Sequence, residues 1–117
     1  MTELERVNVE KRLSDMAVYN GVAYLAGQVP DDPSLDIQGQ TRQVLSKVDQ
    51  LLAMAGSGKA CILMVHIYLA NMKEFEGMNK AWDAWVAVAD APPRVAIETR
   101  LANPDYKIEV AVTAAVP

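Results

Sequence analysis

The sequence PPRVAIETRLANPDYKIEVAVTAAV, residues 92–116, alternates apolar and other side chains with a period of two, interrupted only around Asn103-Pro104-Asp105. A period of two is typical of β-strands, and the interruption predicts two antiparallel strands joined by a short turn. In that hairpin Arg94, Glu98 and Glu109 share one face, with Glu98 about opposite Glu109. Because opposed like charges repel by up to about 1 kcal/mol, we expect a neighbouring arginine, a shared proton or a ligand to compensate. Arg94 lies roughly 13 Å further along this face, a distance that a second subunit could shorten.

The rest of the chain alternates between strand and helix patterns. Asn20-Gly21, between two apolar runs, predicts a hairpin because both residues tolerate positive φ. Further strands are predicted over residues 5–9 and 62–70, and amphipathic helices over 36–55 and from Phe75 to Val86. This order predicts an α+β fold, a two-layer sandwich in which two helices cover one face of a mixed six-stranded sheet. Its other face would be partly bare, which favours oligomerisation.

Length and composition restrict the class of protein. The 117 residues correspond to a single domain, 1–117. A net charge of −4 and the lack of any basic run argue against a nucleic-acid partner, and no apolar run is long enough to cross a membrane. The single cysteine, Cys61, forms no disulfide framework and predicts a reducing, cytoplasmic location.

Four features each have a plain interpretation and a functional one. Gly27, at the end of a strand, marks a bulge or allows close approach of a ligand, and the bulge is the plainer interpretation. His66, the only histidine, is interpreted as a packed residue rather than an acid or base, because its run offers no partner. Asn79 is either an exposed helical residue or the donor of a specific hydrogen bond. Residues 56–59, GSGK, are interpreted as a helix C-cap and not as a phosphate loop.

Several short motifs together identify a family. They are Ala26-Gly27-Gln28-Val29-Pro30, Gly39-Gln40-Thr41, Met78-Asn79-Lys80-Ala81-Trp82, Pro93-Arg94 and Lys107-Ile108-Glu109. In these motifs, and over essentially its whole length, the chain resembles the Rid family of reactive-intermediate deaminases, historically the YjgF/L-PSP family, and within it the YoaB-type branch. The resemblance implies a chorismate-mutase-like fold, a homotrimer, and active sites in clefts between subunits.

The resemblance also implies an activity and a set of site residues. The expected reaction is the hydrolysis of small 2-imino acids, or their enamine tautomers, to 2-oxo acids and ammonia, as in 2-iminobutanoate/2-iminopropanoate deaminases. Arg94 would hold the substrate carboxylate and Glu109 would orient the hydrolytic water, roles that suit a guanidinium and a carboxylate. Gly27 and Ala96 would contact the ligand through their backbone, and Asn79 would border the cleft. Because an iminium carbon is already electrophilic, neither a metal nor an organic cofactor is expected.

Three positions depart from the pattern of the best-known deaminases. A tyrosine near the first hairpin strand is replaced in the region of Leu13, a serine before the loop glycine is Ala26, and a cysteine two residues after the arginine is Ala96. Polar groups account for much of the discrimination in a closed site, so these changes alter substrate fit or weaken turnover. They keep open a second interpretation, a regulatory module that binds a small carboxylate or metabolite without catalysis. A ribonuclease, an old label of this family, ranks last, and a surface ion pair is the plain interpretation of Arg94 and Glu109.

Overall fold

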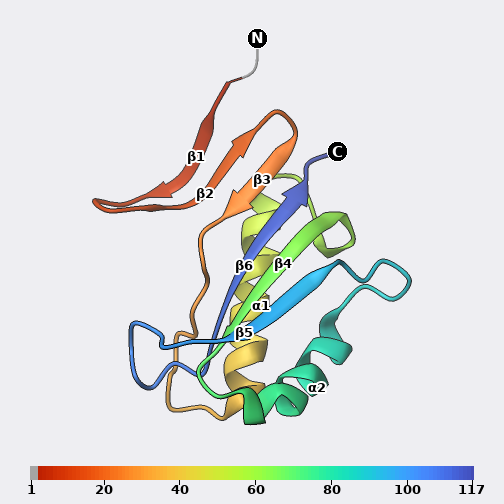
Figure 1. The fold of residues 1–117 in the computed structure, drawn as a ribbon. Coiled ribbons are helices and arrows are strands. Elements are labelled where there is room, and N and C mark those ends of the chain that lie inside the picture. Colours follow the sequence, from red (N-terminus) through yellow and green to blue (C-terminus); the bar gives the residue numbers. More distant parts are fainter. Residues whose placement is uncertain (1–2) are drawn as a thin grey trace.

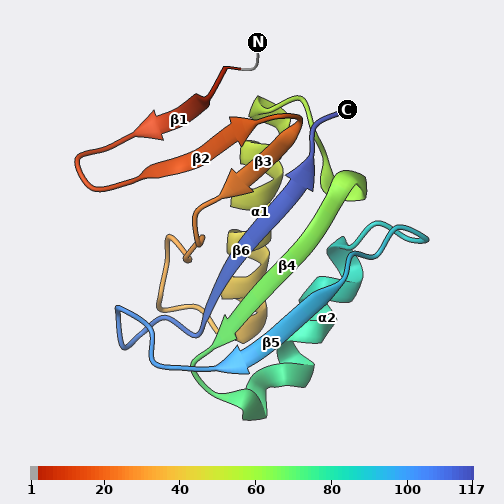
Figure 2. The same ribbon diagram turned by 45° about the horizontal axis from the view of Figure 1, so that its top comes forward.

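The computed structural model describes residues 3–117 and contains one mixed six-stranded sheet with two α-helices packed on the same face (Figures 1 and 2). The elements are β1 (Glu5–Val9), β2 (Ser14–Tyr19), β3 (Val22–Leu25), α1 (Ile37–Met54), β4 (Ile62–Leu69), α2 (Phe75–Trp85), β5 (Arg94–Glu98) and β6 (Ile108–Ala115). Their order along the chain and the two-layer α+β architecture confirm the predicted fold class. The strands lie in the order β1-β2-β3-β6-β4-β5.

The hairpin between β2 and β3 forms where the sequence predicts it. Asn20 and Gly21 have φ values of 53° and 74°, and Tyr19 pairs directly with Val22 on the other side of this two-residue turn. Positive φ at both central positions gives a turn whose twist matches that of the strands. The strand β1 adds to the outer side of this hairpin, antiparallel to β2.

The helix α1 begins and ends at capping residues. The side chain of Asp36 accepts a hydrogen bond from the backbone N–H of Gly39 at 2.9 Å and so caps the start of α1. After α1, Gly56 adopts φ 77° and Ser57 donates its N–H to the carbonyl of Leu52 at 2.8 Å, which confirms that residues 56–59 form a C-cap. Within residues 3–117, neither helix combines the length and the apolar character that crossing a bilayer requires.

The predicted hairpin over residues 92–116 is wrong. The strands β5 and β6 do not pair with each other, because β4 lies between them, parallel to β5 and antiparallel to β6. The helix α2 provides the crossover between the parallel strands β4 and β5, and residues 99–107 form a loop rather than a tight turn (Figure 2). The period of two identifies each strand but carries no information about which strand is its neighbour.

This topology also corrects the predicted faces of the sheet. Arg94 pairs with Val65 and Glu98 with Leu69, and both of these partners are buried beneath the helices. Glu109 pairs with Tyr68 instead, so its side chain lies on the opposite, open face. The predicted opposition of Glu98 and Glu109 therefore does not occur. The apolar core lies between the helices and the sheet and includes Met16, Val44, Leu45, Leu52, Val65, Ile67, Leu69, Met78, Ile108 and Val110.

Candidate functional site

The guanidinium of Arg94 lies against α2. Its Cζ is 4.9 Å from the ring centroid of Trp82 and 5.8 Å from that of Phe75, and its Nη1 lies 3.8 Å from the sulfur of Met78. The side chain is half-buried. No carboxylate lies within ion-pair distance of Arg94 among residues 3–117, so its charge faces aromatic rings and a thioether instead. A surface ion pair, the plain interpretation of this arginine, is therefore not formed within the described chain.

Glu109 lies on the open face of the sheet, directly beside Gly27. A Cβ atom built on Gly27 would lie 2.9 Å from Cδ and 3.1 Å from Cγ of Glu109, closer than ordinary packing allows. The glycine thus leaves the space in which the glutamate side chain sits. The close approach anticipated at Gly27 is made by a side chain of the same chain.

A bulge is present in the same segment. Tyr24 pairs with Thr113 and Gln28 pairs with Val110, so four residues on one strand are matched by three on the other. One extra residue between these pairs is the arrangement of a β-bulge. The bulge interpretation of Gly27 is therefore confirmed, and the bulge carries this glycine past Glu109, whereas contact with a ligand stays a prediction.

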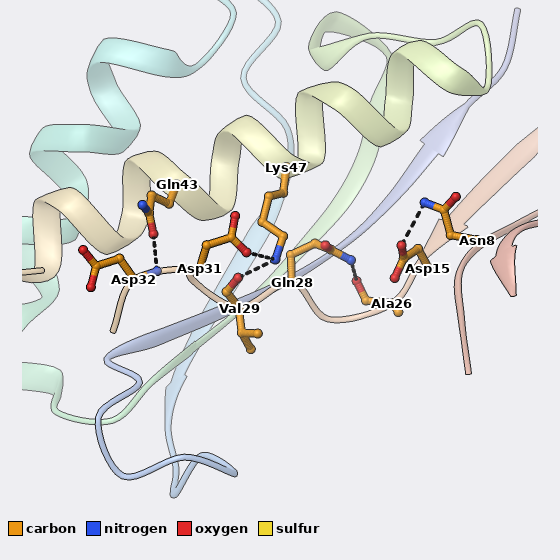
Figure 3. Close-up of polar contacts among 9 residues, drawn as sticks. All are labelled: Asn8, Asp15, Ala26, Gln28, Val29, Asp31, Asp32, Gln43 and Lys47. Atoms are coloured by element: carbon orange, nitrogen blue, oxygen red, sulfur yellow. Dashed lines mark hydrogen bonds and ion pairs between the residues drawn. The ribbon is translucent and has the colours of Figure 1, made fainter. Parts of the chain in front are cut away.

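The loop that follows Gly27 is fastened to α1 (Figure 3). Lys47 donates to the carbonyl of Val29 at 2.9 Å and forms an ion pair with Asp31 at 3.1 Å. The backbone N–H of Asp32 donates to the side chain of Gln43 at 2.9 Å. Further along, the hydroxyl and the N–H of Ser34 donate to Asp32 and lower the pKa of that carboxyl group. These contacts fix the path of the loop and, with it, the position of Gly27.

Gln40 anchors the segment that leads into Glu109, a role that was not predicted from the sequence. Its side chain is completely buried, donates to the carbonyl oxygens of Pro33, Leu35 and Asp105 at 3.0–3.1 Å, and accepts from the N–H of Lys107 at 2.8 Å. Lys107 lies two residues before Glu109, so this amide ties the start of β6 to α1. A buried glutamine on the apolar face of a predicted helix is the signal that could have identified it.

The other predicted ligand-binding residues lie on the helix side of the sheet. Ala96 pairs with the buried Ile67 and therefore lies on the same face as Arg94. Asn79 occupies α2, where its Nδ2 donates to Glu76 at 3.5 Å. Its Oδ1 is buried and has no hydrogen-bond partner among the described residues. The interpretation of Asn79 as the donor of a specific hydrogen bond agrees with the bond from Nδ2, whereas the buried Oδ1 without a partner was not predicted.

Two further polar residues, Glu98 and His66, have contacts that suit a structural role. Glu98 accepts from the backbone N–H of Met72 at 2.8 Å, at the 3-10 turn that leads into α2. His66 is half-buried on the open face, paired with Ala111 on one side and Val95 on the other, which agrees with its interpretation as a packed residue.

Arg94 and Glu109 are not brought together within one chain. They lie on opposite faces of the sheet, and β4 separates their strands. A surface hollow of about 550 Å³, lined by residues that include Glu98, Arg100 and Tyr106, contains neither of them. Of the three positions where departures occur, Ala26 donates its N–H to the backbone carbonyl of Asp15, next to the bulge, and Leu13 is half exposed in the β1–β2 turn. A site that uses both Arg94 and Glu109 requires more than one copy of the chain.

Comparisons with known proteins agree on the family. The sequence model described as Endoribonuclease L-PSP matches residues 3–116. A RutC family protein from Haemophilus ducreyi is 54% identical over 97% of each chain, and the RutC family protein YoaB from Escherichia coli is 41% identical over 95% of this chain and 96% of its own. The crystal structure of a YjgF family member from Neisseria meningitidis superimposes with a TM-score of 0.94, at 37% identity, over 97% of this chain and 94% of that one.

Proposed function

This chain belongs to the endoribonuclease L-PSP family, which includes the YjgF and RutC proteins, and from that premise we propose that it hydrolyses small 2-imino acids, or their enamine tautomers, to 2-oxo acids and ammonia. Arg94 binds the carboxylate of the substrate and Glu109 orients the attacking water. Gly27, Ala96 and Asn79 border the bound molecule. The proposal includes a cytosolic setting, which rests on the single free cysteine, Cys61.

The observation that supports this proposal best is that Arg94 has no carboxylate partner within the described chain. A half-buried guanidinium without a carboxylate partner in the described chain has its hydrogen-bonding capacity available. Such a group matches a carboxylate in bidentate geometry, which supplies both affinity and orientation. A free carboxylate is the feature that all 2-imino acids share.

The reaction needs one acid–base group in addition to Arg94, which binds the substrate carboxylate. Glu109 takes a proton from water while the water oxygen bonds to C2 of the iminium, which gives a tetrahedral carbinolamine. The proton then passes to the nitrogen, the C–N bond breaks, and the electron pair of that bond leaves with ammonia. The second proton of the added oxygen is released as the 2-oxo group forms. Glu109 ends the cycle unprotonated, as it began.

The proposal places this site between copies of the chain. Proteins of this family are typically trimers, and the open face of the sheet exposes Tyr24, Val95 and Ile97, each to between 44% and 51%. Burial of such a face is a common reason for assembly. The strand β5 is an edge strand, so a copy packed on the open face would reach Arg94 around that edge. This arrangement would supply the Glu109 that the same chain cannot present to its own Arg94.

Release of ammonia and 2-oxo acid from freshly generated imino acids of several side-chain sizes tests the proposal. Wild type should exceed the spontaneous rate, and Arg94→Ala and Glu109→Ala should each return the rate to the spontaneous level while the protein stays folded. Equal rates with and without enzyme for every imine would contradict the proposed activity.

A second candidate, a carboxylate-binding module without turnover, is favoured by one observation. Binding needs only Arg94 and the face that carries Ala96, whereas turnover also needs Glu109 from elsewhere. If Arg94→Ala abolishes binding of a 2-oxo acid and Glu109→Ala changes nothing, this second function replaces the first.

A further inference from the structure

The residues around the Arg94 guanidinium come from one side of α2. Phe75, Met78 and Trp82 are spaced by three and four residues, so they lie along one stripe of that helix. All three contact Arg94, through two ring faces and one sulfur atom. None of these groups carries a charge.

The stripe itself is held by the core. Met78 is fully buried and Trp82 is 4% exposed. The ring of Trp82 packs against that of Trp85 with centroids 5.3 Å apart, and the indole N–H of Trp85 donates to Asp49 of α1 at 2.9 Å. A series of contacts therefore leads from α1 to the guanidinium, and of the three residues that contact Arg94 only Phe75 is partly exposed.

An aromatic contact and an ion pair hold an arginine with different consequences. A carboxylate partner would occupy the N–H groups and neutralise the charge, and it would compete with any anionic ligand. A ring face attracts the cation through its quadrupole but accepts no strong hydrogen bond, so the N–H groups stay available. The guanidinium also loses less freedom when a ligand binds, because the rings already restrict it.

We propose that Phe75, Met78 and Trp82 are positioning residues that hold the Arg94 guanidinium for a carboxylate ligand without neutralising it. What Arg94 binds rests on the proposed function, whereas the clamp formed by these three residues stands on the contacts of the chain itself. The expected dependence is on an aromatic ring and not on its exact identity, so Trp82→Phe should keep Arg94 in place and Trp82→Leu should not.

Binding of 2-oxobutanoate and of its methyl ester separates this role from general stabilisation. Phe75→Leu and Trp82→Leu should weaken binding of the acid about fivefold and leave the ester unchanged, and Trp82→Phe should restore most of the affinity. In turnover the same variants should raise KM with kcat almost unchanged. Tyr19→Leu is the matched control, because it also replaces an aromatic ring by leucine, at a 44% exposed position in β2, and this ring has no contact with Arg94. Equal weakening in Tyr19→Leu, or wild-type binding in Phe75→Leu, overturns the proposal.

A spectroscopic measurement tests the clamp independently of the ligand. It remains decisive even if the wild-type protein neither binds nor converts a carboxylate, an outcome that would contradict the proposed function alone. Ring currents from Phe75 and Trp82 should shift the Nε–Hε NMR signal of Arg94 away from the ordinary arginine position. The signal is assigned by its loss in Arg94→Lys. It should move toward the ordinary position in Phe75→Leu and keep its place in Tyr19→Leu. An unchanged signal in Phe75→Leu overturns the clamp.

Discussion

The side chain of Glu109 occupies the space that a Cβ atom on Gly27 would need, since that atom would lie 2.9 Å from Cδ and 3.1 Å from Cγ of the glutamate. These residues are far apart in the chain, and the bulge at the end of β3 brings them together. The position of the Glu109 side chain, the proposed general base, therefore depends on Gly27, a residue without a side chain. Gly27 is not among the glycines with positive φ, so its smallness and not its backbone freedom is what matters.

Gly27→Ala is accordingly expected to displace Glu109 and to lower turnover at least tenfold, with a change in unfolding free energy of about 1 kcal/mol or less. Imine hydrolysis rates and thermal unfolding measure the two effects. Gly58→Ala is the matched control, because a Cβ atom there meets nothing within 4 Å. Wild-type rates in Gly27→Ala would mean that the carboxylate can work from another rotamer.

Gln40→Leu should destabilise the fold by about 3 kcal/mol. The leucine fills a similar volume but leaves buried backbone groups of the two loops without partners, at a cost of about 1–3 kcal/mol each. Chemical denaturation measures the loss. Gln43→Leu on the same helix removes one hydrogen bond to Asp32 and should cost about 1 kcal/mol or less. Similar losses in the two variants would refute the special role of Gln40.

Asn79→Ala should stabilise the protein by about 1 kcal/mol while it lowers activity. The change removes a buried oxygen that has no partner in the described chain and introduces the best helix former. Thermal unfolding and turnover are measured on the same sample. Lys80→Ala, at the exposed next position, should change neither quantity appreciably. A less stable Asn79→Ala protein would show that this oxygen has a bond in the assembled protein.

Ile97→Lys should disrupt assembly, because it places a charge on the open apolar face of β5, where the side chain is 49% exposed. Light scattering should then give the mass of a single 12.8 kDa chain. Turnover should fall as well, because the proposed site needs more than one copy of the chain. Met54→Lys introduces the same charge at a 59% exposed position at the end of α1 and should leave the mass unchanged. If both variants keep the mass of wild type, copies do not meet on this face.

The parts of the fold that depend on neighbours in sequence were predictable. The turn at Asn20-Gly21, the C-cap after α1 and the strand β4 all follow from local patterns. The pairing of β5 with β4 was not, because the alternation over residues 92–116 is compatible with either neighbour. One wrong pairing moved Arg94 and Glu109 onto the same face.

The candidate site was predictable to a different extent. The identities of Arg94 and Glu109 came from resemblance to a family, and their roles remain predictions. The contact of Glu109 with Gly27 and the aromatic surroundings of Arg94 are long-range features that no local pattern contains. Gln40 could have been suspected, because a polar side chain on the buried face of an amphipathic helix needs partners.

The position of β6 in the middle of the sheet has a consequence for how the protein folds. This strand joins β1-β2-β3 to β4-β5, and the two groups of strands meet only through it. Because β1 to β5 all precede β6 in the chain, the sheet cannot close until residues 108–115 are free to pair, and this long-range pairing slows folding. Deletion of β6 would divide the sheet in two, whereas deletion of the edge strand β1 would leave the other five strands connected.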